Sequence, residues 1–433
     1  MFIFLRLKLF DRLKPKSEFN KNIFTLLSGT IIAQAIPIAI SPILTRIYTP
    51  DDFGVFALFL AISSVFGSIS SAKYELAIVL PKKDEDAINI LALGFVITCF
   101  ISLFILCGVI IFGRYFTKLL GNEEIYLWLY FIPLTVFFLG IFNLLSYFNV
   151  RKKNYTTLKN ANIIKSIIFC IVQLAVGLLK PGALGLILGD LVSKMSANLR
   201  LAKNIYTDKT LMSSISKPKM LAIAKRYKDF AKVYALSSLF DTFCKQLVFI
   251  MIPKIFSLTF SGFFFLPHKM IELTSALISN SVSQVYLQKI SENKNNRIGN
   301  LGIFKSTLKK LFVFALFIGV VGYFVSPYIF PFIFGKDWVV SGVIAQYIFI
   351  IFVVKFCVDS LKVTLITYME LKKLAFWQYL YFGTSSIFFG ICLILKVNLK
   401  IFLVLFAIHE YLLYGLCLFL IFRTIYKFDN IKQ

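Results

Sequence analysis

Long apolar runs alternate with short polar links along almost the whole chain. Each run has the length that an α-helix needs to cross a lipid bilayer, roughly 20 residues. The pattern therefore predicts twelve membrane-spanning helices. Their expected ranges are 22–44, 53–72, 87–112, 125–148, 160–179, 182–202, 230–252, 262–287, 305–326, 340–364, 375–395 and 401–422.

The composition agrees with this pattern. Of the 433 residues, 58% are hydrophobic and only 16% are charged. Soluble domains carry about 25% charged residues and cannot bury so much apolar surface. We therefore expect an all-α polytopic membrane protein whose solvent is lipid.

The basic residues set the orientation of the spans. The net charge is +26, which could suggest a nucleic-acid partner, but the lysines and arginines lie mostly in the short links. With the N-terminus inside, the cytoplasmic links hold 33 of the 47 basic residues and the outer links hold 8. This asymmetry predicts that both termini are cytoplasmic and that the chain binds no nucleic acid.

Polar segments divide the chain into five parts. Residues 1–21 alternate basic and apolar positions, which predicts an amphipathic segment on the cytoplasmic membrane surface. A basic cytoplasmic linker, 203–229, separates six spans from six. The remaining expected parts are an N-terminal six-helix bundle at 22–202, a C-terminal six-helix bundle at 230–422 and a cytoplasmic tail at 423–433.

The two predicted bundles share a short sequence echo. "DFGVFALF" follows the first span and "FSGFFFLP" follows the seventh, so that Gly54 and Gly262 each open the second helix of a half. The echo is short, but it agrees with a parallel internal repeat, as in several transporter folds.

Charged residues inside the spans are the candidate functional groups, because a charge at membrane depth needs a partner or a hydrated cavity. Three acid–lysine sets at i,i+4 spacing share a helix face: Asp190 with Lys194, Asp241 with Lys245, and Lys355 with Asp359. The other intramembrane charges and histidines are Lys165, His268, Lys269, Glu272, Lys362, His409 and Glu410. Either each set neutralises itself and the lysines near helix ends, Lys165 and Lys362, extend to the membrane interface, or the helices surround one hydrated cavity.

Such a cavity would hold more cations than anions. The lysines suit an anionic cargo such as a phosphate or diphosphate head group. The acids Asp190, Asp241, Glu272, Asp359 and Glu410, with His268 and His409, would counter the lysines or couple transport to protons or sodium ions. The sequence has no phosphate-binding GxxxxGK[ST] loop and no catalytic constellation. We expect no enzyme activity, no cofactor and no metal site.

One stretch resists assignment from hydropathy. "SAKYELAIVLPKKDEDA", residues 71–87, holds a short apolar run between charges. Lys73 and Glu75 would lie at the cytoplasmic end of the second span. There Lys73 would either guide an anionic head group into the cavity or anchor the helix end.

Four sequence blocks in the first quarter of the chain carry a family resemblance. They are Gly29-Thr30 with Ala33-Gln34, "SPILTR" with Tyr48, "PDDFG" at 50–54, and "YELAIVLP" with Asp86-Ala87. Together they resemble the opening of the bacterial O-antigen and capsule repeat-unit flippases (Wzx-like) of the multidrug/oligosaccharidyl-lipid/polysaccharide exporter (MOP) superfamily. "YKDFAKVYALSSLFD", "NSVSQVYLQKISE" and "FIFGKDWVVSGVIAQYI" are similar to landmarks of the family's second half.

This resemblance implies a MATE-like fold of two six-helix bundles in the cytoplasmic (inner) membrane. It implies alternating access that moves an undecaprenyl-diphosphate-linked oligosaccharide to the periplasmic leaflet for surface polysaccharide synthesis. Membrane lipids, a polysaccharide polymerase and a chain-length regulator are the partners it implies. The family usually has arginine where Lys73 stands, and lysine keeps the charge but loses the bidentate fork.

The residues then lead to a set of cavity candidates and leave rival functions open. The expected translocation residues are Lys73, Lys165, Lys194, Lys245, Lys269, Lys355 and Lys362, with Glu75 and the acids and histidines above as charge partners. A multidrug or other ion-coupled exporter on the same fold is the first alternative, although cationic drugs favour an acidic cavity. A repeat-unit polymerase is the second, although the outer links are short for such an enzyme.

Overall fold

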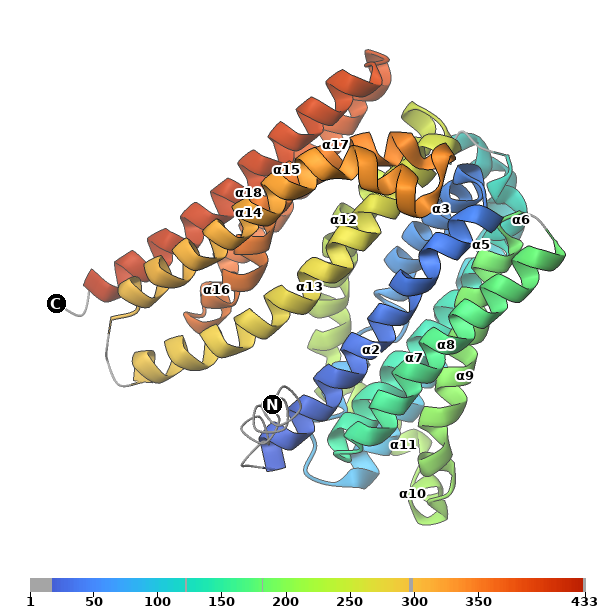
Figure 1. Ribbon diagram of the computed structural model, residues 1–433. Coiled ribbons are helices and arrows are strands. Elements are labelled where there is room, and N and C mark those ends of the chain that lie inside the picture. Colours follow the sequence, from blue (N-terminus) through green and yellow to red (C-terminus); the bar gives the residue numbers. More distant parts are fainter. Residues whose placement is uncertain (1–17, 121–122, 181, 296–298, 431–433) are drawn as a thin grey trace, which may run out of the picture. The chain divides into compact units, whose positions relative to one another are not determined.

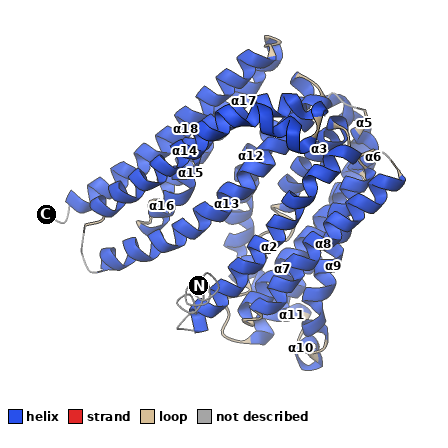
Figure 2. Cartoon of the chain, in the orientation of Figure 1, coloured by secondary structure: helices blue, strands red, loops and turns tan. Residues whose placement is uncertain are grey.

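The computed structural model describes residues 18–120, 123–180, 182–295 and 299–430. Within these ranges the secondary structure is helical, with turns and short loops between the helices (Figures 1 and 2). The predicted amphipathic segment 1–21 and the tail 423–433 lie partly outside the described residues. The fold class, an all-α polytopic membrane protein, is confirmed.

The first half of the chain forms nine helices within the described residues. They are α2 (Glu18–Ile47), α3 (Pro50–Gly67), α4 (Tyr74–Ala77), α5 (Asp84–Leu120), α6 (Ile125–Leu129), α7 (Ile132–Arg151), α8 (Tyr155–Leu179), α9 (Leu184–Tyr206) and α10 (Lys209–Ser213). The second predicted span is shorter than expected, because α3 ends at Gly67 and residues 68–73 form turns.

The rest of the chain is equally helical. It comprises α11 (Lys217–Arg226), the π-helix η1 (Phe230–Tyr234), α12 (Ala235–Ile255), α13 (Leu258–Asn295), α14 (Leu301–Phe334), the 3₁₀-helix η2 (Lys336–Trp338), α15 (Val339–Leu361), α16 (Val363–Thr367), α17 (Leu371–Ile394) and α18 (Leu399–Asn430).

Ten of the helical segments in the described ranges are long and apolar enough to cross a membrane. The other two predicted spans form α9 and α13, which are 23 and 38 residues long. Charged residues lower their mean hydropathy, since Asp190 and Lys194 lie in α9, and Lys269 and Glu272 lie in α13. Length is therefore not what sets these two helices apart; their polar content is.

The surface of the long helices is apolar, as a lipid solvent requires. On α5, Phe100 and Phe104 are 71% and 72% exposed. A soluble protein rarely exposes contiguous large side chains of this kind. These aromatic rings are placed to face lipid acyl chains.

The chain divides into two compact units. Unit 1 contains the residues up to Ile40, Phe66–Gly113 and Leu127–Ser238, and unit 2 contains Ser41–Val65, Arg114–Tyr126 and the residues from Leu239 onward. Each is described by itself below.

In unit 1, α7 and α8 both pack against α9 (Figure 1). The core of this unit also includes residues from outside the predicted spans. Tyr74 and Ile78 from the "YELAIVLP" stretch, and Ile223 from α11, are buried in it with Phe148 and Leu201. The motif and the linker are thus parts of the packed unit rather than loose connections.

In unit 2, α15 is the central helix. It packs against α13, α14 and α18, and more than half of its residues are buried. Gly319 and Gly342 allow close packing: a Cβ atom on Gly342 would lie 2.8 Å from the carbonyl oxygen of Ser326. The hydrophobic run at 340–364 is therefore a core helix of its unit, covered on several sides by other helices.

The start of α3 also belongs to unit 2, where it meets the start of α13. A Cβ atom on Gly54 would lie 2.0 Å from the carbonyl oxygen of Leu258, and one on Gly262 would lie 1.8 Å from that of Pro50. The two glycines that echo each other in the sequence therefore sit in one backbone contact. Nearby, Asp51 accepts a hydrogen bond of 2.6 Å from Thr259.

Candidate functional site

Charged side chains from α12 and α17 meet in unit 2. Lys245 and Asp241 lie one turn apart on α12 and form an ion pair of 2.5 Å. The second carboxylate oxygen of Asp241 accepts a 3.0 Å hydrogen bond from Gln378 of α17. Asp241 is thereby fixed by two partners, whereas Lys245 remains 61% exposed.

The charges of α13 lie in the same electrostatic environment. Lys269 and Glu272 approach to 3.7 Å. The Glu272 carboxylate also interacts electrostatically with His268, with Lys245 of α12 and with Lys355 of α15. The ring of His268 stacks on Phe264 of its own helix, with centroids 5.8 Å apart. Three helices thus direct charged groups toward one region.

The charges of α15 are paired differently from the sequence-based prediction. Asp359 pairs with Lys362, at 2.7 Å, rather than with Lys355. The Lys355 ammonium lies instead over the ring of Tyr414 from α18, 5.8 Å from its centroid. The i,i+4 spacing alone did not predict these contacts. Lys362, three residues after Asp359, competes with Lys355 for the carboxylate, and the ring of Tyr414 on a neighbouring helix offers Lys355 another partner.

Glu410 on α18 is the most buried acid of the region. It is 4% exposed, and its two carboxylate oxygens accept hydrogen bonds of 2.8 and 3.0 Å from the Tyr381 hydroxyl of α17. The neighbouring His409 lies 3.5 Å from the same carboxylate and 3.2 Å from the hydroxyl of Thr384. The hydrogen bond from the phenol offsets part of the free-energy cost of burying the Glu410 carboxylate.

These residues make up the C-terminal charge cluster. Its members are Asp241, Lys245, His268, Lys269, Glu272, Lys355, Asp359, Lys362, His409 and Glu410. In the pairs of Asp241 with Lys245 and of Asp359 with Lys362, the lysine is more exposed than its acid. In the third pair the exposures are similar, 42% for Lys269 and 46% for Glu272. The more exposed charged groups of these pairs are therefore three lysines and one acid.

Unit 1 holds a second, smaller group. Asp190 and Lys194 form the predicted i,i+4 ion pair on α9, with both side chains largely shielded. Lys165 of α8 interacts electrostatically with both, and its ammonium lies 4.4 Å from the ring centroid of Phe142 on α7. The predicted cavity residues are thus divided between the two units.

Lys73 and Glu75 form a third charged feature, at the turn before α4. Glu75 is 3% exposed, accepts a short hydrogen bond from Ser71, and lies 3.6 Å from the Lys73 ammonium. Ala72 and Lys73 have φ angles of 49° and 62°, a left-handed conformation that costs energy in residues other than glycine. Lys73 therefore has an acidic partner within its own turn, and the choice between anchoring the helix end and guiding a head group stays a prediction.

The family of the chain follows from comparison with known proteins. A family model described as "Polysaccharide biosynthesis protein" matches residues 43–343. The chain belongs to this family. No curated protein sequence matches it significantly.

Solved structures of transporters share the fold of this polysaccharide biosynthesis protein. The inward-facing conformation of a multidrug resistance MATE family transporter of the MOP superfamily matches with a TM-score of 0.62 at 11% identity, over 94% of this chain and 95% of that one. The outward-facing conformation of such a transporter matches with a TM-score of 0.57 at 13% identity, over 95% and 96%.

A third match is a MOP superfamily transporter from Pyrococcus furiosus, with a TM-score of 0.54 at 13% identity over 94% of this chain and 96% of that one. Identities this low establish the fold alone. Family and fold together support a transporter rather than an enzyme. Among the described residues, no group of three or more His, Cys, Asp or Glu side chains is arranged to hold a metal ion.

Several residues of the charge clusters are absent from the sequence-based candidates. Gln378, Tyr381, Thr384 and Tyr414 contact the charged members from α17 and α18. Each is a single polar or aromatic residue in an apolar run, and such residues are frequent in this chain. Only the helix packing distinguishes them.

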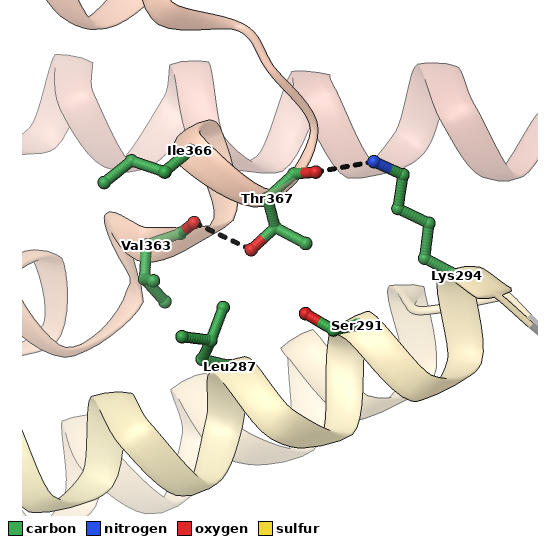
Figure 3. Close-up of a pocket in the computed structure, with 6 residues that line it drawn as sticks. All are labelled: Leu287, Ser291, Lys294, Val363, Ile366 and Thr367. Carbon is green, nitrogen blue, oxygen red and sulfur yellow. Dashed lines mark hydrogen bonds between the residues drawn. The ribbon is translucent and has the colours of Figure 1, made fainter. Parts of the chain in front are cut away.

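A pocket in unit 2 is lined by none of the residues of the C-terminal charge cluster. Figure 3 shows it between α13 and α16, lined by Leu287, Ser291, Lys294, Val363, Ile366 and Thr367. The Lys294 ammonium donates a 2.6 Å hydrogen bond to the Thr367 carbonyl. The volume is about 230 Å³, which is small for a ligand pocket. The pocket therefore does not compete with the charge cluster as the main site.

Proposed function

We propose that this protein is a flippase for undecaprenyl-diphosphate-linked oligosaccharide repeat units. It would move them across the inner membrane by alternating access for O-antigen, capsule or exopolysaccharide synthesis. The C-terminal charge cluster carries the proposal, because three lysines and one acid, Glu272, are the more exposed groups of its ion pairs. The family, described as a polysaccharide biosynthesis protein, is consistent with a cargo that serves polysaccharide synthesis.

The chemistry of the cluster suits a diphosphate. Lys245, Lys269 and Lys362 each keep more than two fifths of the side chain exposed. An ammonium group is a compact charge with three donors, which can bind phosphate oxygens without a fixed geometry. Because each also has an acidic partner, release of the cargo leaves no unpaired buried charge.

Ion coupling belongs to the same proposal. Glu410 is a buried carboxylate hydrogen-bonded to Tyr381. Asp241 and Asp359 are further acidic residues of the same cluster. An intramembrane acid of this kind can exchange a proton or a sodium ion during a transport cycle. The polymerase and chain-length regulator would act on the delivered repeat units.

The test removes two cations of the cluster. Lys245→Ala with Lys355→Ala should lower surface polysaccharide at least tenfold and cause lipid-linked repeat units to accumulate on the cytoplasmic side. Lys400→Ala, which removes an exposed lysine outside the cluster, is the matched control. A double variant that is present at normal levels and supports full surface polysaccharide would sink the assignment.

A multidrug exporter on the same fold is the second candidate, favoured by the fold of the multidrug MATE transporters. The Pyrococcus furiosus transporter, described as having a binding pocket of reverse polarity that suggests a different function, supports the view that pocket charge follows cargo. Drug susceptibility of a deletion strain separates the two. Unchanged susceptibility together with lost surface polysaccharide supports the flippase.

A further inference from the structure

The basic linker is docked on unit 1 in a fixed orientation. The Tyr74 hydroxyl donates a 3.2 Å hydrogen bond to the Ala224 carbonyl of α11. Asn89 of α5 donates to the Ser214 carbonyl, at 3.0 Å, and accepts from the Ser216 amide, at 2.9 Å. These bonds hold both ends of the turn that leads into α11.

One face of α11 completes the core of unit 1. Ile223 is buried there, and Tyr227 packs against the same core. Lys219 adds an ion pair of 2.9 Å to Glu85 at the start of α5. This face therefore cannot turn outward without breaking apolar and ionic contacts together.

The opposite face of α11 is basic. Lys217, Leu221 and Lys225 follow one another at spacings of four residues, which place them on one side of α11, and Lys228 follows two residues after the helix ends. All four are exposed, and Leu221 is 65% exposed. We call these four residues the α11 basic face. A long apolar side chain among lysines is typical of a helix that lies in a membrane interface.

Most of the charge of this segment is not compensated within the segment itself. Residues 209–232 include seven basic residues but only one acidic residue, Asp229. The next candidate span begins at Phe230, four residues after α11 ends. Val233 and Tyr234, in the first turns of that span, are 61% and 55% exposed. The basic face is thus tied covalently to a point where the chain enters lipid.

We propose that the α11 basic face binds the anionic phospholipid head groups of the cytoplasmic leaflet, with Leu221 inserted among them. Basic side chains next to a span attract anionic lipid, and several together hold a segment on the surface. The position of the linker would then depend on the lipid composition of the membrane. Because Tyr74 and Asn89 are hydrogen-bonded to the linker, the position of the "YELAIVLP" stretch would depend on it as well. This goes beyond the flippase function and holds for any cargo.

The experiment uses the full-length protein in nanodiscs. In a variant whose seven cysteines are replaced, Leu221→Cys is labelled with a water-soluble maleimide in discs of phosphatidylcholine alone and in discs with 30% phosphatidylglycerol. Labelling should slow at least fivefold with phosphatidylglycerol, and about 1 M salt should remove the difference, because it shortens the screening length to about 3 Å.

Matched charge changes separate this site from general attraction. Lys217→Gln with Lys225→Gln and Lys228→Gln should abolish the lipid dependence of labelling. Lys305→Gln with Lys309→Gln and Lys310→Gln, which neutralises three exposed lysines of α14, should preserve it. Equal labelling in both kinds of disc, or equal loss in both triple variants, would overturn the proposal. Neither readout depends on transport, so failure of the flippase assignment would leave this test intact.

Discussion

Arg151, at the end of α7, contacts the segment that follows α4 through both charge and backbone. Its guanidinium donates to Asp84 at 2.9 Å, to the Pro81 carbonyl at 2.6 Å and to the Ile78 carbonyl at 3.2 Å. A planar group with five N–H donors can serve these three acceptors at once. The Arg151 side chain therefore fixes where the apolar run of "YELAIVLP" ends and α5 begins.

Replacing Arg151 should destabilise unit 1. Arg151→Ala is expected to lower the free energy of unfolding by about 2 kcal/mol, because it removes several hydrogen bonds to a charged, shielded group. Arg151→Lys should retain only part of that stability, since an ammonium cannot span the same acceptors. Thermal unfolding of the purified protein measures both, and Lys82→Ala, at an exposed position of the same segment, should change little. Equal melting temperatures for Arg151→Ala and the wild type would contradict this account.

The hydrogen bond from Tyr74 to α11 should be visible as a pH effect. Burial raises the pKa of Tyr74 above its ordinary value of 10, so that the neutral phenol is favoured in the folded state. The contribution of the neutral Tyr74 side chain to folding stability is then fully present below pH 10. It is lost as the pH rises through the raised pKa of Tyr74. Tyr74→Phe should melt at a lower temperature than the wild type at pH 8, by about 1 kcal/mol in stability. The difference should shrink above pH 10, and a constant difference across this range would count against the bond.

At the scale of elements, α11 contributes to the core of unit 1 although the pattern of apolar residues does not predict that it is buried there. The run from Ser71 to Ala87 and the linker 203–229 are too polar or too short to read as spans, and hydropathy treats both as connections. In the structure, Tyr74, Ile78 and Ile223 share one core. Their contact joins residues about 150 positions apart, which no local pattern specifies. The long helices were predictable because their apolar length alone selects a span.

The contact between α3 and α13 sets a steric limit. Gly262→Ala would place a methyl group within 2 Å of the Pro50 carbonyl oxygen, far inside van der Waals contact, so the two helix starts must separate. We expect faster labelling of a cysteine introduced at Thr259, and a lower melting temperature. Gly415→Ala, where a Cβ atom would meet nothing within 4 Å, is the control. Unchanged labelling in Gly262→Ala would show that this contact is not tight.

For the molecule as a whole, the sequence indicated which residue types form the site but not all of their partners. Intramembrane charges are rare enough to be found by inspection. Their pairing depends on neighbouring helices: Lys355 lies over Tyr414, and Asp359 turns to Lys362. The rotation and packing of the helices determine which partner each charged residue contacts. Neither can be predicted from the residue spacing within one helix.

The proposed alternating access would give the α3–α13 contact a role in the transport cycle. The predicted topology would place this contact at the outer side of the membrane, since it follows the first and seventh predicted spans. Transport of a large head group past this side would require the helix starts to separate. Asp51 and Thr259, joined by a 2.6 Å hydrogen bond, are therefore positions where a reversible cross-link should stop the cycle.

A cysteine pair at these positions tests the role directly. In a background without the seven native cysteines, Asp51→Cys with Thr259→Cys should form a disulfide under oxidation, because side chains this close can bring two sulfur atoms within bonding distance. The oxidised protein should lose repeat-unit export, and a reductant should restore it. Each single cysteine variant controls for the substitutions themselves. Full export by the cross-linked protein would mean that α3 and α13 stay together throughout transport, so the cargo must leave by another route.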